Sequence, residues 1–291
     1  MNVNGLLDCH THCMFSPDGN DDPVELVNKA VDLGLKALAV TDHCECNTWF
    51  EPECYGIDSK SADEDDILMY NCKEYHNKSL EKMQELKQRH YDDGFEFIHG
   101  VELGQPLQAP EIAREITSDK SIDYIIGSLH NNSGEKDFYF LSFDHLSMND
   151  IYSLLDDYYA QVLEMCQQAE FDILGHLTYP YRYICGKYGI QIDNSRYKDI
   201  SAEIFRTLIA KGKGIEINTS SLFTHLASTM PGEELVRLYR DLGGEILSLG
   251  SDAHCAENVG QGIDIGAQLA KSCGFKYAAY FKQHKPYFIS L

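Results

Sequence analysis

The chain has 291 residues, of which 43% are hydrophobic, and its 24 Lys and Arg against 46 Asp and Glu give a net charge of −22. This composition excludes a disordered or collagen-like chain and argues against an extended nucleic acid as the main ligand, although a small phosphorylated substrate remains compatible. No apolar run reaches the ~18 residues of a membrane span, and the start MNVNGLLDCHTH lacks the basic region and apolar core of a signal peptide. We therefore expect no membrane association, a cytoplasmic location and reduced thiols for the ten cysteines.

Short apolar runs alternate with helical patterns along the chain. We expect strands at 5–10, 37–41, 95–102, 124–130, 171–176, 215–218 and 245–251. The first helix begins at Asp22 as N-cap with Pro23 in its first turn and ends near Gly34. Further helices are expected at 74–90, 149–169, 201–211, 232–242 and 262–273.

Seven strand-then-helix units predict an α/β fold with a parallel sheet, and their number favours a closed barrel over an open sheet. The run 277–280 is a possible eighth strand, and the final residues KPYFISL either pair as a last strand or dock on the barrel floor. We expect residues 1–291 to form a single domain, because no linker-like stretch or close internal repeat interrupts the pattern.

Two longer segments follow predicted strands. Residues 44–72 hold the only Trp, several acids and four Cys, and residues 177–198 are rich in Tyr and basic residues. In a parallel barrel the loops after the strands build the functional face. Both segments, a loop insertion at 44–72 and a substrate loop at 177–198, are therefore candidate lids or substrate walls.

Imidazoles and carboxylates gather at the predicted strand ends. The first strand ends in His10-Thr11-His12, where side chains two apart on an extended segment point the same way. Six of the seven strand ends carry such a group, and the set of nine candidates is His10, His12, Asp18, His43, Glu102, His130, His176, Asp252 and His254. Nitrogen and oxygen donors suit Zn, Mn or Fe, and nine exceed the roughly four protein ligands that one ion takes. The sequence thus predicts two or three metal ions at this end of the sheet.

The other histidines have weaker claims to a site. His99 lies three positions from Glu102 and hence on the opposite strand face, whereas the rest lie in helices or loops: His76, His90, His145, His225 and His284. Because no Cys-x-x-Cys occurs, a structural zinc cluster is not supported, and Cys44 and Cys46 are expected to be small buried residues.

The motifs DCHTH, SPDG, VTDH, GVELG, GSLHN, GHL and GSDAH, in this order over about residues 6–260, resemble the PHP (polymerase and histidinol phosphatase) family. Within it, the chain length, SPDG and the segment GHLTYPYRYICGKYG are similar to stand-alone histidinol phosphatases. The resemblance implies a distorted (β/α)7 TIM-like barrel with a trinuclear metal site at the C-terminal ends of its strands. It also implies hydrolysis of L-histidinol phosphate to L-histidinol and phosphate in histidine biosynthesis.

The same resemblance implies a division of the ligands among three divalent ions (Zn, Mn and/or Fe). One ion would take His10, His12, Glu102 and Asp252. A second would take Asp18, His43 and His254, and a third would take Glu102, His130 and His176. Glu102 and a hydroxide would bridge, and the hydroxide would attack phosphorus.

Phosphomonoester hydrolysis also needs groups for the leaving alkoxide and for the substrate. We expect Asp18 or His254 to supply the proton and Arg182 to clamp the phosphate, because a guanidinium fork matches phosphate oxygens. Lys187 and Arg196 are weaker candidates for that clamp. An imidazole ring could be flanked by the aromatic cluster of Tyr179, Tyr181 and Tyr183. The substrate amine could meet an acid among Glu45, Glu51, Glu53 and 63–66.

Three alternatives remain open. The first is another PHP-type phosphoesterase, acting on a nucleotide, an oligonucleotide or phosphotyrosine. The second is an amidohydrolase-type C–N hydrolase, although such enzymes commonly carry a carboxylated Lys where this chain has His130. The third is a metal store or regulatory domain without enzymatic activity.

Overall fold

A computed structural model describes residues 2–46, 73–91 and 94–291. Its main sheet has seven parallel strands in chain order: β1 (Leu7–Asp8), β2 (Ala37–Glu45), β3 (Glu96–Gly104), β4 (Tyr124–Ser128), β5 (Ile173–Leu174), β6 (Gly214–Asn218) and β7 (Leu247–Gly250). Backbone hydrogen bonds join the chain at the ends of the first and last strands, among them Cys9 N to Leu249 O and Asp252 N to His10 O, each 2.8 Å long. The sheet therefore curves into a nearly closed, distorted TIM-like barrel, and the predicted fold class is confirmed.

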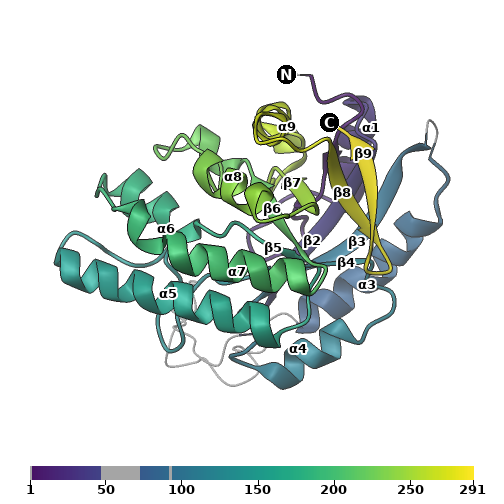
Figure 1. Ribbon diagram of the computed structural model, residues 1–291. Helices are drawn as coiled ribbons and strands as arrows, with labels where there is room; N and C mark the ends of the chain where they lie inside the picture. The colour runs from purple at the N-terminus through teal and green to yellow at the C-terminus, as the bar shows by residue number, and fades with distance from the viewer. Residues whose placement is uncertain (1, 47–72, 92–93) are drawn as a thin grey trace.

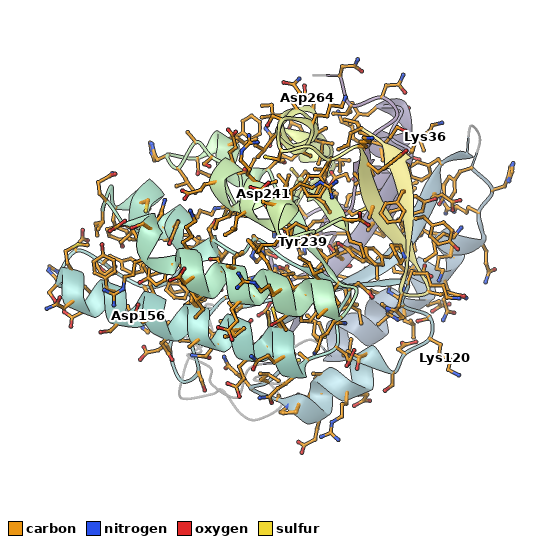
Figure 2. All side chains as sticks on the ribbon, in the orientation of Figure 1. Lys36, Lys120, Asp156, Tyr239, Asp241 and Asp264 are labelled. Carbon is orange, nitrogen blue, oxygen red and sulfur yellow. The ribbon has the colours of Figure 1, made fainter. Side chains whose placement is uncertain are left out.

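Helices occupy the connections between the strands (Figure 1). They are α1 (Pro23–Asp32), α3 (Lys73–Gln88), α4 (Pro110–Thr117), α5 (Met148–Gln168), α7 (Lys198–Ala210), α8 (Glu233–Asp241) and α9 (Ile263–Ser272). The predicted start of α1 is confirmed, because the side chain of Asp22 accepts from Val24 N at 2.8 Å. Exposed acids such as Asp156 on α5 and Asp241 on α8 project from the outer helices (Figure 2).

The segment after β5 is more ordered than a loop. It contains α6 (Tyr179–Tyr181), a π-helix (Arg182–Lys187) and a 3-10 helix (Asn194–Tyr197). Further 3-10 turns follow β6 at Ser220–Phe223 and β7 at Ala256–Asn258. The 177–198 segment therefore presents its aromatic and basic side chains from helical turns at the carboxyl end of β5.

The run at 277–280 is not an eighth barrel strand. It forms β8 (Tyr277–Lys282), which pairs antiparallel with β9 (Lys285–Ser290) in a separate two-stranded sheet. The physical reason is that the hydrogen bonds between the ends of β1 and β7 leave no barrel edge to which an eighth strand could pair. At the hairpin tip, His284 N donates to Asp123 O at 2.8 Å, and its Nδ1 lies 2.9 Å from Asp172 Oδ2. Because these acids directly precede β4 and β5, the hairpin tip docks at the amino ends of the barrel strands.

Parts of the predicted insertion lie outside the described residues. Only Cys44, Glu45 and Cys46 of the segment 44–72 are described, so Trp49, Glu51, Glu53 and 63–66 are not placed. No disulfide joins the cysteines of the described ranges. Among the helices of those ranges, none is both long and apolar enough to cross a membrane.

Candidate active site

The carboxylate of Glu102, on β3, lies at the centre of the predicted ligands. Its side chain is only 1% exposed. One oxygen, Oε2, lies 3.3 Å from His10 Nε2, 3.5 Å from His12 Nε2 and 3.0 Å from His43 Nδ1. His10 and His12 follow β1, and His43 lies on β2. In the sheet, β2 lies between β1 and β3.

The other oxygen of Glu102, Oε1, faces a second pair of histidines. It lies 3.1 Å from His130 Nε2 and 2.8 Å from His176 Nε2, and these two nitrogens are 3.4 Å apart. The two residues follow β4 and β5, the next strands in the sheet. The two oxygens of Glu102 thus divide the histidines into two groups, as a carboxylate shared between cations would.

Asp252, directly after β7, faces the same nitrogens as Glu102 from the other side of the barrel. Its Oδ1 lies 3.7 Å from His10 Nε2 and 3.3 Å from His12 Nε2. The backbone of Asp252 adopts a positive φ of 55°, in the left-handed region that non-glycine residues rarely occupy. Such a conformation costs free energy, and strained residues of this kind commonly occur at functional sites.

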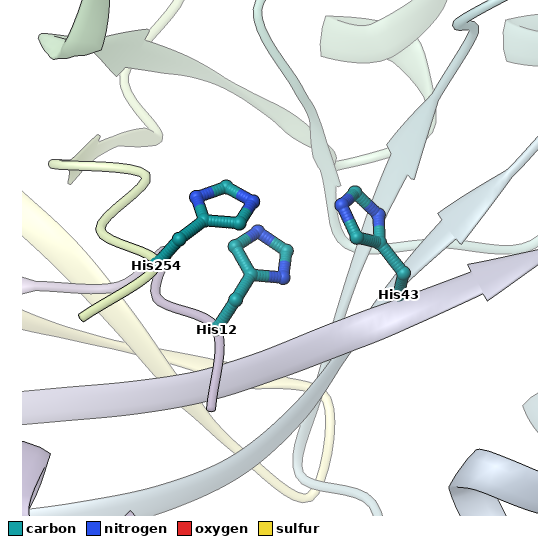
Figure 3. Close-up of side chains that lie close together, drawn as sticks. All are labelled: His12, His43 and His254. Atoms are coloured by element: carbon teal, nitrogen blue, oxygen red, sulfur yellow. The ribbon is translucent and has the colours of Figure 1, made fainter. Parts of the chain in front are cut away.

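A third group lies nearer the solvent. His12 stands between His43 and His254 (Figure 3), and its ring centroid lies 4.3 Å from that of each of them. Asp18 caps this group, since its Oδ2 lies 3.1 Å from His254 Nε2 and its Oδ1 lies 3.7 Å from His43 Nε2. The side chain of Asp18 is 57% exposed, so this group opens the site to solvent.

The structure therefore brings all nine predicted ligands to one place. Donor atoms lie within 4.8 Å of one another in three groups: His12, His43 and His254; His10, His12 and Glu102; and His43, Glu102 and His130. These groups cut across the sets that the family resemblance implied, because His12 joins the solvent-side group. The division of the nine donors among ions stays a prediction.

Several donor atoms of this cluster fit a cation. Within the described part of the chain, His10 Nε2, His12 Nε2 and Glu102 Oε2 are buried and have no hydrogen-bond partner. Buried polar atoms without a partner are costly and need an explanation such as a bound ion. Two imidazole nitrogens and a carboxylate oxygen directed at one another are the donors that zinc, manganese and iron accept. The residues present thus fit a metal site.

The charges of the cluster are strongly coupled. Burial opposes ionisation of Glu102, yet His10, His130 and His43 hold the pKa of its carboxyl well below the usual range. Burial likewise disfavours protonated His10, but the carboxylates of Glu216, Glu102 and Asp252 raise its pKa well above the usual value. Without a metal, the imidazole of His10 therefore carries positive charge between these carboxylates. A bound cation would take over that role and release protons.

Burial and the neighbouring His43 and His254 lower the pKa of His12 to about 3. His12 thus stays neutral in the middle of the cluster, and an imidazole must be neutral to bind a metal.

Two acceptors behind the histidines were missed from the sequence. Glu216 Oε1, on β6, lies 2.7 Å from His10 Nδ1. Ser16 Oγ lies 3.2 Å from His12 Nδ1 and donates to Asp42 Oδ1 at 2.9 Å. The only sequence signal for Glu216 is a carboxylate inside the apolar run GIEIN.

Glu45, predicted among acids for the substrate amine, ends β2 inside the cluster. Its Oε1 lies 3.0 Å from His130 Nδ1 and 3.1 Å from His43 Nδ1. This position makes Glu45 a partner of the predicted ligands, whereas the other acids of that prediction fall outside the described residues.

Arg182 lies at the edge of the cluster. Its Nη1 donates to Ser220 Oγ at 3.0 Å and lies 4.0 Å from Asp252 Oδ2, and its side chain is 30% exposed. The weaker candidates are engaged elsewhere, since Lys187 lies over the ring of Tyr188 and Arg196 pairs with Asp156 on α5. Of the three cations, Arg182 is the one that the structure brings beside the predicted ligands.

The three tyrosines of the 177–198 segment divide between two sides. The ring of Tyr179 lies 4.9 Å from that of His130 and 5.1 Å from that of His176. Tyr183 donates to the Tyr179 hydroxyl at 3.0 Å. The Tyr181 hydroxyl instead accepts from Tyr159 of α5 at 3.2 Å. Because this contact does not test whether Tyr181 flanks the substrate, that role stays a prediction.

The PHP domain family matches residues 8–220 of this chain. A probable histidinol-phosphatase of Thermotoga maritima is 26% identical over 274 residues, which cover 94% of this chain and 95% of that protein. A histidinol-phosphatase of Lactococcus lactis subsp. lactis is 27% identical over 286 residues, covering 96% of this chain and 95% of that protein.

Two solved structures share the fold. The crystal structure of the Lactococcus lactis subsp. lactis histidinol phosphate phosphatase, complexed with zinc, L-histidinol and phosphate, matches with a TM-score of 0.73 at 27% identity. That match covers 97% of this chain and 99% of the other. The structure of a histidinol phosphatase candidate from Listeria monocytogenes matches with a TM-score of 0.70 at 19% identity, over 89% of this chain and 99% of the other.

Proposed function

Because this chain belongs to the PHP domain family, we propose that it is a histidinol-phosphatase, which hydrolyses L-histidinol phosphate to L-histidinol and phosphate. The observation that carries the proposal is the buried carboxylate of Glu102 among converging imidazoles at the carboxyl end of the barrel strands. Relatives that match nearly the full length of this chain bear the name of that activity. The substrate is accordingly a small phosphorylated molecule.

The proposed cofactors are three divalent ions, drawn from zinc, manganese and iron. Zinc in the related Lactococcus lactis structure and the donor groups described above support this proposal. The ligands would be the nine predicted residues, with Glu102 shared between ions. When bound, such cations lower the pKa of water and neutralise the phosphoryl oxygens.

The phosphate end of the substrate would meet Arg182. Within the described ranges, its guanidinium lies beside Asp252 and donates one hydrogen bond, to Ser220, so other donors of the fork can reach phosphate oxygens. Asp18 is the most exposed of the predicted ligands, and its Oδ2 lies 3.1 Å from His254 Nε2. Asp18 or His254 would supply the proton of the leaving alkoxide at this open side of the site, through an atom that is not bound to an ion, since one atom cannot hold both a proton and a cation.

The other end of the substrate carries an imidazole and a cationic amine. Tyr179, whose ring packs against His130 and His176, offers an aromatic flank for the imidazole. Its hydroxyl donates to Asp137 Oδ1 at 3.0 Å. Burial raises the pKa of Asp137 to about 6, so above that pH it is a carboxylate that can receive the amine. We assign these roles to Tyr179 and Asp137, with Tyr183 behind them.

The test is phosphate release from L-histidinol phosphate by zinc- or manganese-loaded protein, with a chelated sample beside it. We expect metal-dependent release with a kcat/KM far above that for generic phosphomonoesters. Preference for a nucleotide or phosphotyrosine would keep the phosphoesterase class and reject this substrate. If the protein binds three ions but releases phosphate from no ester, the proposed reaction class is wrong.

Two broader predictions go with this function. A cytoplasmic location and a single domain spanning residues 1–291 are what a small-molecule enzyme of this kind would have. Fractionation of the native cells and limited proteolysis of the whole chain would test them.

A further inference from the structure

We propose that Glu216 is a positioning residue that fixes the tautomer and orientation of His10 for metal binding. The inference rests on the metal centre of the proposed function but not on its substrate. It starts from β6, which alone among the described barrel strands supplies none of the nine predicted ligands. This strand places a buried carboxylate behind two of those ligands.

Both oxygens of Glu216 are engaged, each with a different predicted ligand. Oε1 lies 2.7 Å from His10 Nδ1, and Oε2 accepts from the backbone N–H of His176 at 2.9 Å. The side chain is 1% exposed, so water does not compete for these oxygens. His10 follows β1 and His176 follows β5, so one carboxylate ties together ligands from strands that are not neighbours in the sheet.

The short distance to Nδ1 determines the tautomer of His10. A carboxylate accepts hydrogen bonds and does not donate them, so Nδ1 must carry the proton. The lone pair of a neutral His10 is then on Nε2. Among the residues that the structure describes, that atom is buried without a hydrogen-bond partner, and it lies 3.3 Å from Glu102 Oε2 and 3.7 Å from Asp252 Oδ1. Glu216 therefore directs the metal-binding nitrogen of His10 at the two carboxylates of the site.

The neighbouring backbone is shaped for this pair. Gly250, at the end of β7, packs against both side chains, and a Cβ there would overlap Glu216 Oε1 and His10 Cβ. Asn218 adds a further constraint, since its Nδ2 lies 3.4 Å from each oxygen of Glu216. The same Nδ2 donates to Asp252 Oδ2 at 3.2 Å, which connects Glu216 to a second predicted ligand.

Glu216→Gln is the sharpest test, because an amide has the shape of the carboxylate but one acceptor oxygen instead of two. Either His10 Nδ1 or the His176 N–H then loses its acceptor. We expect zinc affinity to fall about 10- to 100-fold for at least one ion, the usual cost of losing an acceptor behind a metal-bound histidine. The measurement is competition with a chromophoric chelator, together with the zinc content per chain after dialysis.

Asp172→Asn is the matched control. Asp172 is also a buried carboxylate that accepts a backbone bond, from Ile125 N at 2.8 Å, but it lies at the amino end of β5. This variant should keep the zinc affinity of the wild type. If folded Glu216→Gln binds zinc as tightly as the wild type and in the same amount, Glu216 has no positioning role.

A second measurement serves if Glu216→Gln fails to fold. The 15N spectrum of histidine in zinc-loaded wild-type protein should show His10 protonated on Nδ1 and metal-bound through Nε2, with the signal assigned by its loss in His10→Gln. Protonation on Nε2 would overturn the proposal. Neither readout requires turnover: loss of zinc in Glu216→Gln beside an inactive wild type would reject the proposed substrate and keep this inference.

Discussion

His43 and Glu102 face each other in register on the adjacent parallel strands β2 and β3, with Nδ1 of the histidine 3.0 Å from Oε2 of the glutamate. The register of these strands runs from Ala37 opposite Glu96 to Glu45 opposite Gly104. Because backbone pairing continues past the pair, neither residue is at the free end of a strand. The ladder thus holds Glu102 in place at the centre of the imidazoles.

Glu102→Gln should remove the shared carboxylate with little change in shape. We expect loss of bound metal and a fall in kcat/KM of more than about 100-fold, beyond the 10- to 100-fold typical of residues that only support a ligand. Metal content per chain and phosphate release measure the two effects. His145→Ala, an exposed histidine in the loop after β4, should leave both unchanged. Full activity of Glu102→Gln would mean that the site lies elsewhere.

The strands and the nine candidate ligands could be predicted because both follow from simple periodicities. Strands that alternate with helices along the chain pair in parallel, and the carboxyl ends of parallel strands meet at one end of a barrel. Glu216 could not be predicted in the same way. It lies inside a strand, and its role depends on reaching His10 across the barrel, which no spacing in the sequence reports.

The aromatic prediction illustrates a second limit. Residues 177–198 have the composition of a loop, but Tyr179 begins a helical segment that continues to Lys187. Residues four apart in helical turns share a face, whereas residues two apart do not. Tyr179 and Tyr183 therefore bond to each other beside the histidines, and Tyr181 turns to Tyr159. When the segment is interpreted as a loop, its sequence does not indicate which tyrosines share a face.

Arg182→Ala should weaken the grip on the phosphate. We expect kcat/KM for L-histidinol phosphate to fall at least about tenfold, equivalent to about 1.4 kcal/mol of transition-state stabilisation. Arg182→Lys should recover part of the loss, because it restores the charge without the fork. Arg196→Ala is the control, since Arg196 is paired with Asp156 on the outer surface. Equal kinetics for wild type and Arg182→Ala would remove Arg182 from the site.

Tyr179→Phe and Asp137→Asn should act together on substrate selection. The first removes the hydroxyl that donates to Asp137 Oδ1 at 3.0 Å, and the second removes the charge proposed to receive the amine. We expect each to raise KM for L-histidinol phosphate by about tenfold or less and to spare a generic phosphomonoester. A double-mutant cycle should give a coupling energy of at least about 0.5 kcal/mol. Additive effects would show that the two residues act separately. Tyr181→Phe is the control variant, because the Tyr181 hydroxyl bonds to Tyr159 instead.

The pair of His284 and Asp172 should make the stability of the hairpin depend on pH. The hydrogen bond to Asp172 raises the pKa of His284 above its usual 6.5. The protonated histidine therefore stabilises the folded state fully below pH 6.5, and this contribution is lost as the pH rises through the higher pKa of the folded protein. His284 is 39% exposed, so solvent screens the pair and the gain is about 1 kcal/mol at most.

Replacement of His284 by Ala should consequently lower Tm more at pH 6 than at pH 9, by a difference below about 4 °C. Thermal unfolding of wild type and variant in matched buffers measures this difference. The chelated protein is the better sample, because metal binding at the opposite end of the barrel has its own pH dependence. A Tm difference that is constant between the two pH values, or larger at pH 9, would show that protonated His284 does not stabilise the docked hairpin.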